Sequence, residues 1–321
     1  MSEALRPAPG AVFDVVIIGG GPAGLSAALN LGRARFSVAI IDAGRPRNAA
    51  TLRSHGFLTR DGVPPLELRK LARAELAQYP TLRVFDRAVA TRVIEQPGGG
   101  DERFVVALSG RGNGIPPAVA ARSVLVATGL RETLPAIESL RSYYGISVFS
   151  CAACDAWELQ DRPLALIGET RDLAARARLL ARWTDALTVF TNGSDAVDTV
   201  EEAELAAAGI AVERREIADL EGERGAVSGV RLKDGDVVPV EGGFVRPVWD
   251  PALGFLDGID AERDADGHLV VDRSGRTGVA GLYAAGDAAA PGPQQLIVAA
   301  GQGARVAAVL VHDQVGVVTA H

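Results

Sequence analysis

Apolar runs typical of buried strands alternate with helical patterns along the first third of the chain. Val12–Ile18 is a continuous apolar, β-branched run and predicts a buried parallel strand. Leu25–Ala34, rich in Ala and Leu, predicts a helix after it, and Ser37–Ile41 predicts a second strand. Leu66–Tyr79 carries apolar residues at helical spacing and predicts an amphipathic helix. This alternation is typical of an α/β protein.

Short strands separated by turns interrupt the alternation between residues 82 and 129. Leu82–Phe85 and Val89–Ile94 have strand patterns, and Phe104–Leu108 lies between two breaks rich in Gly and Pro. Together they predict a small antiparallel insertion. Val124–Gly129 predicts a further buried strand that closes on a tight turn.

A second strand–turn–helix unit begins at Pro163–Ile167, and Leu187–Phe190 predicts its next strand. Its turn, Gly168–Leu173, keeps only one glycine of a dinucleotide-binding fingerprint. A site for NADPH usually places arginine after the next strand and a site for NADH an acid, but this chain has Thr191–Gly193 there. The unit has the outline of a nucleotide-binding domain without its chemistry, so a retained structural scaffold is the alternative.

The first predicted strand and helix are joined by a glycine-rich turn, Gly19–Gly24, and the second strand ends in Asp42. In G-x-G-x-x-G turns the glycines let the backbone approach a pyrophosphate at the helix N-terminus, and an acid about 20 residues on binds a ribose hydroxyl. A glycine turn used only for packing is the alternative. The register of strand, turn, helix and acid favours a dinucleotide site.

Composition limits the classes of function. The 321 residues allow two domains, and 48% hydrophobic and 23% charged residues are ordinary for a globular protein. A net charge of −7 argues against a nucleic-acid binder. We find no uncharged apolar run of the ~18 residues that a membrane span needs, and no apolar signal core in the first ten residues. A cytoplasmic protein without membrane partners is therefore expected.

The only two cysteines, Cys151 and Cys154, form a Cys-x-x-Cys pair followed by Asp155. In a reducing cytosol this spacing favours a redox dithiol, whose thiol pKa a helix N-terminus would lower. Asp155 is placed to pass a proton as the disulfide opens. Zinc binding and inert core packing are the alternatives, but a structural zinc needs about four ligands and only four scattered histidines accompany the pair. No metal site is expected.

Two further polar sites lie near predicted turns. The loop containing Arg45–Asn48 and Ser54–Phe57 is expected to lie over whatever the first helix binds, and His55 is either a cofactor contact or a solvated histidine. Near the end of the chain, the strand Leu282–Asp287 ends on Gly-Asp and precedes an Ala-rich helix. Asp287 is expected to bind a sugar-like hydroxyl chain, to cap a helix, or both.

In their order along the chain, these parts resemble the low-molecular-weight thioredoxin reductases. The motifs that carry the resemblance are Gly19–Gly24, Ala127-Thr128-Gly129, Cys151–Asp155, Ala285-Gly286-Asp287, and Gln295 with Ala299-Ala300-Gly301. The resemblance implies the pyridine nucleotide-disulfide oxidoreductase fold, with two Rossmann-like, three-layer ββα domains in a homodimer. It implies an FAD domain formed by residues 1–129 and 243–321, split by an inserted domain, 130–242, that carries the thiols.

The resemblance also implies roles for single residues. Cys154 faces the flavin, Cys151 exchanges with the partner, and Asp155 is the acid/base. The residues expected to bind FAD are Gly19, Gly21, Pro22, Ala23, Gly24, Asp42, Asn48, His55, Val89, Ala127, Thr128, Gly129, Gly286, Asp287, Gln295 and Leu296.

Other segments resemble a branch of FAD-dependent dithiol oxidases, which close disulfides in natural products of the gliotoxin and holomycin type with oxygen instead of NADPH. These segments are Asp42–Asn48, His55–Leu58 and Trp157-Glu158, although Asp155-Ala156 stands where that branch usually has His-Gly. We expect a dithiol/disulfide oxidoreductase that acts on a small-molecule or protein dithiol or disulfide, uses NADPH poorly, and has oxygen or ferredoxin as electron partner. An NADPH-dependent thioredoxin reductase and a flavin-bound thiol redox sensor are the alternatives.

Overall fold

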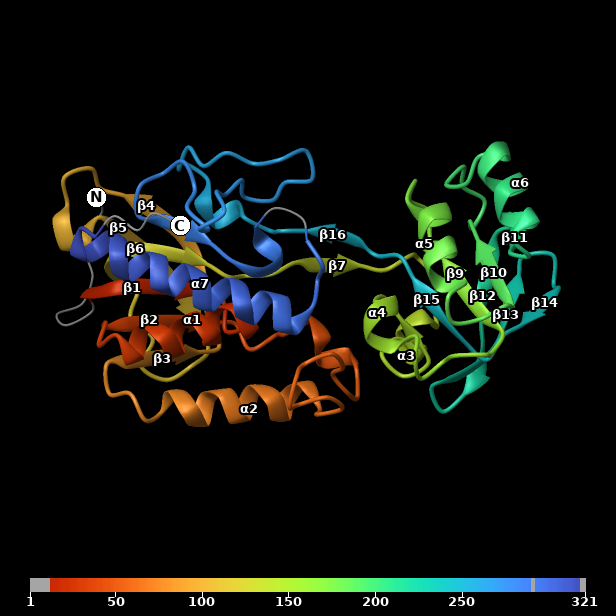
Figure 1. Cartoon of the computed structure of the whole chain (residues 1–321), viewed down its shortest axis with the longest axis horizontal. Helices are drawn as coiled ribbons and strands as arrows, with labels where there is room; N and C mark the ends of the chain where they lie inside the picture. Colours follow the sequence, from red (N-terminus) through yellow and green to blue (C-terminus); the bar gives the residue numbers. More distant parts are fainter. Residues whose placement is uncertain (1–11, 290–291, 318–321) are drawn as a thin grey trace. The chain divides into compact units, whose positions relative to one another are not determined.

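The computed structural model describes residues 12–289 and 292–317 and forms two compact units (Figure 1). The first unit comprises Met1–Arg47, Leu66–Arg131 and Asp250–His321. The second comprises Asn48–Pro65 and Glu132–Trp249. The chain therefore leaves the first unit twice, once for the short loop Asn48–Pro65 and once for the long insertion.

The first unit is built on one mixed sheet in the order β3-β2-β1-β6-β5-β4, with β17 paired to β6. Strands β1, β2, β3, β6 and β17 run parallel, while β4, β5 and β6 form an antiparallel meander. The bounds are β1 Val12–Ile18, β2 Val38–Asp42, β3 Leu82–Asp86, β4 Ala88–Glu95, β5 Phe104–Gly110, β6 Ala118–Val126 and β17 Leu282–Ala284.

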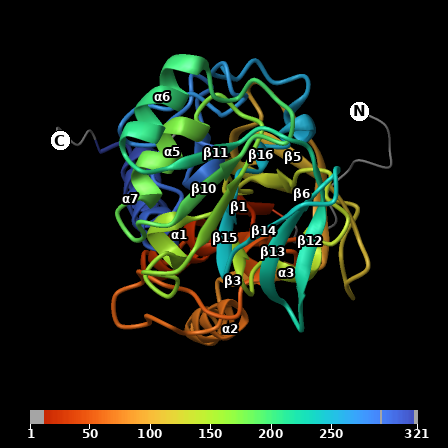
Figure 2. The ribbon, with the colours of Figure 1, turned by 90° about the vertical axis from the view of Figure 1, so that its right-hand side faces the viewer.

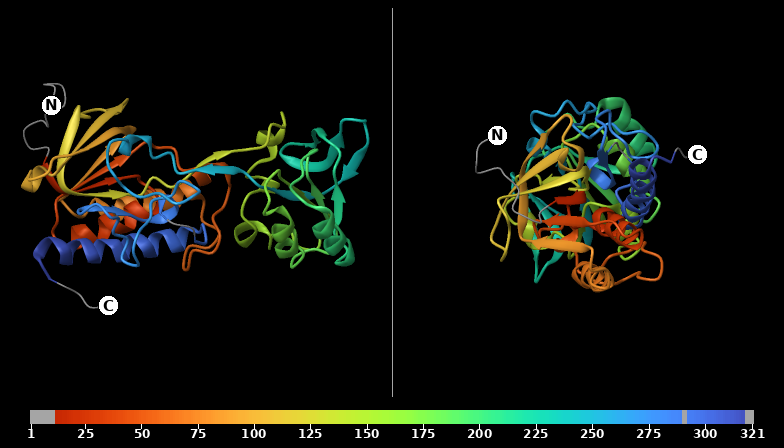
Figure 3. Two further views of the ribbon diagram at one scale, coloured as in Figure 1. Left: turned by 90° about the horizontal axis from the view of Figure 1, so that it is seen from above. Right: turned by 90° about the vertical axis from the view of Figure 1, so that its left-hand side faces the viewer.

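Both faces of this sheet are covered, which explains why β1 is apolar throughout. Val15 and Ile17 pack into a core with helices α1 (Pro22–Arg33) and α7 (Leu296–Val315), which lie against each other. Figure 3 shows these helices on one side of the sheet. Val16 and Ile18 pack into the opposite core with β4 and β5. Helix α2 (Pro65–Leu76) also belongs to this unit.

Helix α7 is long and apolar enough by length and composition to cross a membrane, with a mean hydropathy of 1.2. A core helix of a soluble protein passes the same test, so this is weak evidence. Val306, Ala307, Val309 and Leu310 of α7 are buried in the core shared with α1.

The second unit has three layers (Figure 2). Its central sheet has the order β11-β10-β9-β15-β8 and is parallel throughout. Leu164 and Leu166 of β9 pack into the core with helices α5 and α6, whereas Ala165 and Ile167 pack with the antiparallel sheet β12-β13-β14. The bounds are β8 Val148–Phe149, β9 Leu164–Ile167, α5 Leu173–Leu180, β10 Leu187–Phe190, α6 Thr199–Ala207, β11 Ala211–Glu213, β12 Ile217–Glu223, β13 Ala226–Leu232, β14 Val237–Pro239 and β15 Gly242–Val245.

Two strands, β7 (Arg131–Thr133) and β16 (Val248–Asp250), carry the chain between the units and pair with each other. The remaining short elements are η2 Arg47–Ala50, η3 Gly100–Glu102, α3 Leu140–Tyr143, α4 Ala152–Asp155, η4 Gly254–Leu256 and η5 Gly286–Ala288.

The predicted α/β class with Rossmann-like elements is confirmed, and the predicted strands lie within a few residues of their observed positions. The first helix begins at Pro22 and not at Leu25, because proline is well suited to the first turn, where its missing N–H costs nothing. The compact units differ from the predicted domain ranges chiefly at Asn48–Pro65, which the sequence assigned to the first domain. That FAD binds to the first unit stays a prediction.

Candidate active site

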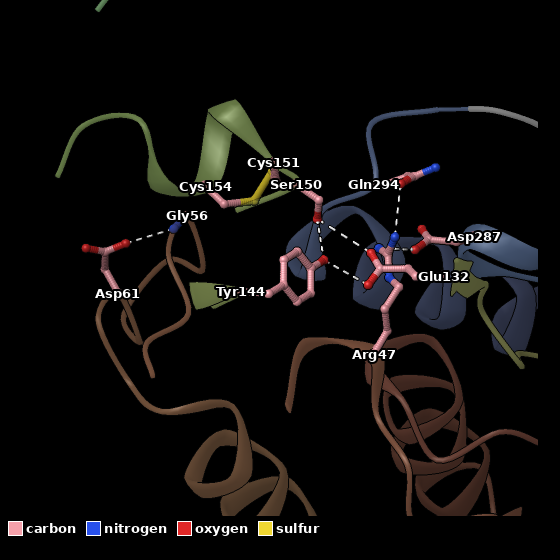
Figure 4. The surroundings of a disulfide bond; sticks show 10 residues. All are labelled: Arg47, Gly56, Asp61, Glu132, Tyr144, Ser150, Cys151, Cys154, Asp287 and Gln294. Carbon is pink, nitrogen blue, oxygen red and sulfur yellow. Dashed lines mark hydrogen bonds and ion pairs between the residues drawn. A yellow bond between two sulfur atoms is a disulfide. The ribbon is translucent and has the colours of Figure 1, made fainter. Parts of the chain in front are cut away.

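Cys151 and Cys154 form a disulfide with their Cα atoms 5.3 Å apart (Figure 4). Both residues are half-buried. Helix α4 spans only Ala152–Asp155, and Cys151 is its N-cap. The expected lowering of a thiol pKa by a helix N-terminus is therefore not supported, because a helix of one turn has little macrodipole. Between residues 12 and 317, omitting 290 and 291, no group of three His, Cys, Asp or Glu side chains is arranged to hold a metal ion.

The residue before the disulfide is held by a polar network that sequence reasoning missed. The Tyr144 hydroxyl lies 2.9 Å from the Ser150 hydroxyl and 2.8 Å from a carboxylate oxygen of Glu132 (Figure 4). The Trp249 indole N–H donates to Glu132 at 3.4 Å. These residues come from three separate parts of the second unit, so their spacing along the chain gave no signal.

Asp155 is buried, with only 8% of its surface exposed. Burial raises the pKa of its carboxyl to about 7, while the charge of His55 lowers this pKa and the charge of Glu158 raises it. Asp155 is the last residue of α4 and Cys151 is the N-cap, so Asp155 does not cap this helix. A carboxyl that titrates near neutral pH beside a dithiol has the property that general acid–base catalysis requires.

The loop Asn48–Pro65 brings His55 to the same region of the second unit. His55 Nε2 lies 3.5 Å from Glu158 Oε1, and Nδ1 lies 3.5 Å from Asp61 Oδ2. The sequence left His55 open between a cofactor contact and a solvated histidine. The structure gives it acidic neighbours and a side chain only 15% exposed. Asn48, the other predicted cofactor residue of this loop, lies in the turn η2.

The first glycine turn has the form that a pyrophosphate site requires. Gly19 has φ = +120°, and a Cβ there would overlap the carbonyl of Ala127. A Cβ on Gly24 would overlap the carbonyl of Gly19. By contrast, a Cβ on Gly21 would meet no atom within 4 Å, so the space next to this backbone is open. Gly19 and Gly24 thus allow backbone segments to pack closely, whereas Gly21 leaves room for a ligand.

Asp42 ends β2 beside this turn and is 5% exposed. Gly44 N–H donates to its Oδ1 at 2.8 Å, and Arg69 and Arg73 of α2 both donate to its Oδ2. An ionised carboxylate offers about four acceptor positions, so one remains for a ribose hydroxyl. The sequence predicted Asp42 but missed both arginines, although their four-residue spacing places them on one face of α2.

A cavity of about 720 Å³ opens in the first unit next to these arginines. Its charged lining comes mostly from basic residues, namely Arg69, Lys70, Arg73, Arg87 and Arg111, with Asp86. Its volume lies within the usual range for small-molecule sites.

Asp287 lies in the short turn η5 after β17. Arg47 donates to Asp287 at 2.8 Å and to Gln294 at 3.1 Å (Figure 4). The Gly286 N–H donates to the side chain of Gln302 at 2.7 Å. Asp287 does not cap α7, whose N-cap is Gln295, so the capping alternative is wrong for this helix.

The other predicted cofactor residues of the first unit lie at strand and helix ends. Pro22 and Ala23 open α1, Ala127, Thr128 and Gly129 directly follow β6, Leu296 opens α7, and Val89 lies on β4. Since β1, β2, β6 and β17 are parallel, Gly19, Asp42, Ala127 and Gly286 lie at or just after the carboxyl ends of strands at one edge of the sheet. In doubly wound sheets ligands bind at this edge.

This combination of a sheet-edge dinucleotide site with a Cys-x-x-Cys disulfide matches one protein family. The family model for pyridine nucleotide-disulphide oxidoreductases matches residues 13–303. The chain belongs to that family. It is an FAD-dependent disulfide oxidoreductase of the thioredoxin reductase type, as its motifs predicted.

Its relatives extend over nearly its whole length. A thioredoxin reductase from Aquifex aeolicus is 28% identical over 321 residues, covering 96% of this chain and 95% of that protein. A solved structure described as a putative thioredoxin reductase TrxB from Bacillus anthracis is 35% identical, with a TM-score of 0.86 and coverage of 95% and 99%. The solved structure of HlmI is 34% identical, with a TM-score of 0.88 and coverage of 97% and 95%.

The first unit fits the FAD that this family binds. The open space at Gly21, the remaining acceptor position of Asp42 and the cavity beside Arg69 and Arg73 are the features of the structure that accommodate it.

Proposed function

We propose that this oxidoreductase exchanges electrons with a dithiol substrate at Cys151–Cys154 and uses NADPH poorly. The strongest support comes from the turn before α5. Family members that bind a dinucleotide in this unit would bind the pyrophosphate of that dinucleotide at this turn. The turn already holds an anion of its own, the carboxylate of Asp172, at the N-cap of α5.

Asp172 is firmly held in that position. The Arg246 guanidinium donates to it at 2.9 Å, that of Arg176 at 2.7 Å, and the Thr170 hydroxyl at 2.6 Å. Burial alone would raise the pKa of Asp172, but these hydrogen bonds outweigh it and lower the pKa to about 2. The carboxylate is therefore charged at neutral pH and accepts the hydrogen bonds of both guanidinium groups, which a pyrophosphate at this turn would otherwise accept.

The polar residue at the end of β10, where the ribose of NADPH would lie, already has partners within the protein. At the end of β10, Asn192 donates to Glu169 at 2.7 Å and accepts from the Ile217 N–H at 2.9 Å. The NADPH-dependent alternative is thus not favoured by this unit.

The dithiol half-reaction follows from the residues at the disulfide. A substrate thiol gives its proton to the Asp155 carboxylate, and the resulting thiolate attacks Cys151 Sγ, releasing the Cys154 thiolate. The second substrate thiol then attacks the substrate sulfur of this mixed disulfide and releases Cys151, which takes the proton from Asp155. The substrate leaves as a disulfide, and its second proton and two electrons remain with the dithiol pair.

FAD, when bound, supplies the two-electron acceptor for the reduced pair. We propose oxygen as the final acceptor, so that a dithiol and O₂ yield a disulfide and hydrogen peroxide.

Anaerobic reduction of the flavin by NADPH, NADH, dithiothreitol and reduced ferredoxin, measured in parallel, tests the proposal. We expect dithiothreitol to bleach the flavin and micromolar NADPH to leave it oxidised. Rapid bleaching by NADPH would restore the thioredoxin reductase alternative. Bleaching by dithiothreitol without steady peroxide release in air would leave a redox sensor.

A further inference from the structure

The basic cavity of the first unit lies at the strand next to the one that ends in Asp42. Along the carboxyl edge of the sheet, β1 leads into the turn Gly19–Gly24, β2 ends in Asp42, and β3 reaches the cavity with its last residue, Asp86. Helix α2, which Figure 1 shows beside β3, lines the cavity as well. All of these elements belong to the first unit.

The charges that line this cavity are only partly balanced. The three basic residues that α2 contributes all pair with carboxylates. The pairs are Arg69 with Asp42, Arg73 with Asp42 and Asp86, and Lys70 with Glu67. The other two basic residues, Arg87 and Arg111, make no ion pair with any residue in the part of the chain that the structure describes. Three carboxylates thus balance three cations, and two positive charges remain uncompensated at Arg87 and Arg111.

The backbone keeps these two arginines next to each other. The Arg111 N–H donates to the Arg87 carbonyl at 3.2 Å. Glycines lie on both sides of Arg111, and a Cβ on Gly110 or Gly112 would overlap the carbonyl of Arg87 or of Asp86. Arg87 itself has φ = +54°, a conformation that is uncommon for residues other than glycine, asparagine and aspartate. Two like charges are therefore held side by side by turns that pack too closely to move apart freely.

FAD does not supply an anion for Arg87 and Arg111. Its charged group is the pyrophosphate, which is expected at Gly21 after β1, and β2 lies between β1 and β3. The adenosine of FAD, which extends from the pyrophosphate past Asp42, carries no charge. The positive charge of the cavity thus has no counterpart in the cofactor.

We propose that this cavity binds the phosphate group of a second small molecule, beside FAD, through Arg87 and Arg111. A phosphate monoester carries a charge of about −1.5 to −2 at pH 7, which matches the two uncompensated cations. Guanidinium groups bind phosphate oxygens through paired, charge-assisted hydrogen bonds. Leu66 and Val84 also line the cavity and offer apolar surface to the organic part of a phosphate ester. This inference does not depend on the proposed dithiol exchange.

The experiment titrates the purified, FAD-loaded protein with UMP, uridine and inorganic phosphate by calorimetry, while the flavin absorbance is followed. UMP is preferred to AMP because AMP is half of FAD and would compete for the cofactor site. We expect UMP to bind at least about tenfold more tightly than uridine, since uridine lacks the charge-assisted hydrogen bonds. Tighter binding of UMP than of inorganic phosphate would identify a phosphate ester as the ligand, and equal binding would identify the free anion. The flavin spectrum should not change.

Arg87→Gln and Arg111→Gln each remove one of the two cations and leave the backbone of the turns unaltered. Each variant should weaken the binding of UMP at least about tenfold and keep its FAD content. Arg92→Gln, which removes an exposed arginine of β4 outside the cavity, is the matched control and should bind UMP as wild type does.

Three results would overturn the inference. The first is a lack of binding of both UMP and inorganic phosphate at millimolar concentration, and the second is equal weakening in Arg92→Gln. The third is release of FAD by UMP, or loss of FAD from Arg87→Gln and Arg111→Gln without a change in UMP binding, which would assign the two arginines to the cofactor instead. If Arg87→Gln does not fold, Arg111→Gln decides by the same measurements.

Discussion

Replacing Asp155 by asparagine tests both the chemistry and the burial of this carboxyl. Its pKa is raised from 3.8 to about 7, mainly by burial. At 1.36 kcal/mol per unit, ionising Asp155 in the folded protein costs up to about 4 kcal/mol. The pKa of Asp155 is higher in the folded protein than in the unfolded chain. The stabilisation that comes from burying the protonated carboxyl is therefore complete below pH 3.8 and is lost as the pH rises through about 7. Wild-type stability should therefore fall over this range relative to a variant that cannot ionise.

Asparagine has nearly the same shape and does not titrate. We expect Asp155→Asn to gain stability over wild type between about pH 4 and 8, by up to about 4 kcal/mol. All three tryptophans, Trp157, Trp183 and Trp249, belong to the second unit, so their fluorescence during urea unfolding reports on the unit that contains Asp155. Asp185→Asn, which removes an exposed carboxyl of the same unit, is the matched control and should show no such gain.

The same variant should lose activity while it gains stability. Without the proton exchange, dithiol-driven flavin reduction should fall at least about tenfold, since general acid–base catalysis contributes about 10²–10⁴-fold. If Asp155→Asn and wild type show the same dependence of stability on pH, the carboxyl is not buried as described. Unchanged turnover across pH 6–9 would remove Asp155 from the mechanism.

Three further predictions concern the flavin site, the cysteines and the nucleotide-type turn. Gly21→Val should have the thermal stability of flavin-free wild type but lose most FAD, because its Cβ meets no protein atom, whereas Gly24→Ala should destabilise the fold itself; full flavin content in Gly21→Val would place the cofactor elsewhere. If Cys154 faces the flavin, Cys151→Ser should show a long-wavelength charge-transfer absorption band and Cys154→Ser should trap the substrate as a mixed disulfide, and a band in Cys154→Ser would reverse the two roles. Asp172→Ala should improve the binding of NADPH, measured by calorimetry, by removing the carboxylate that pairs with Arg176 and Arg246 at the turn before α5, and an unchanged or weaker affinity would contradict the role given to that carboxylate.

The sequence alone determined those features that depend on neighbours along the chain. The apolar run of β1, the glycine turn and the acid at the end of β2 are local patterns, and each element formed where its pattern predicted. The disulfide between Cys151 and Cys154 could equally be predicted from the sequence, because two cysteines three residues apart always lie close in space. The absence of an arginine after β10 could also be read directly.

The tertiary structure decided which charges meet. Arg69 and Arg73 lie 27 and 31 residues from Asp42, Arg246 lies 74 residues from Asp172, and about a hundred residues separate His55 from Glu158. Each of these contacts depends on how helices and loops pack, and sequence spacing carries no information on it. The pKa of a buried group depends on burial and on the charges that lie near it in space. The raised pKa of Asp155 and the lowered pKa of Asp172 in the turn before α5 could therefore be recognised only in the folded structure.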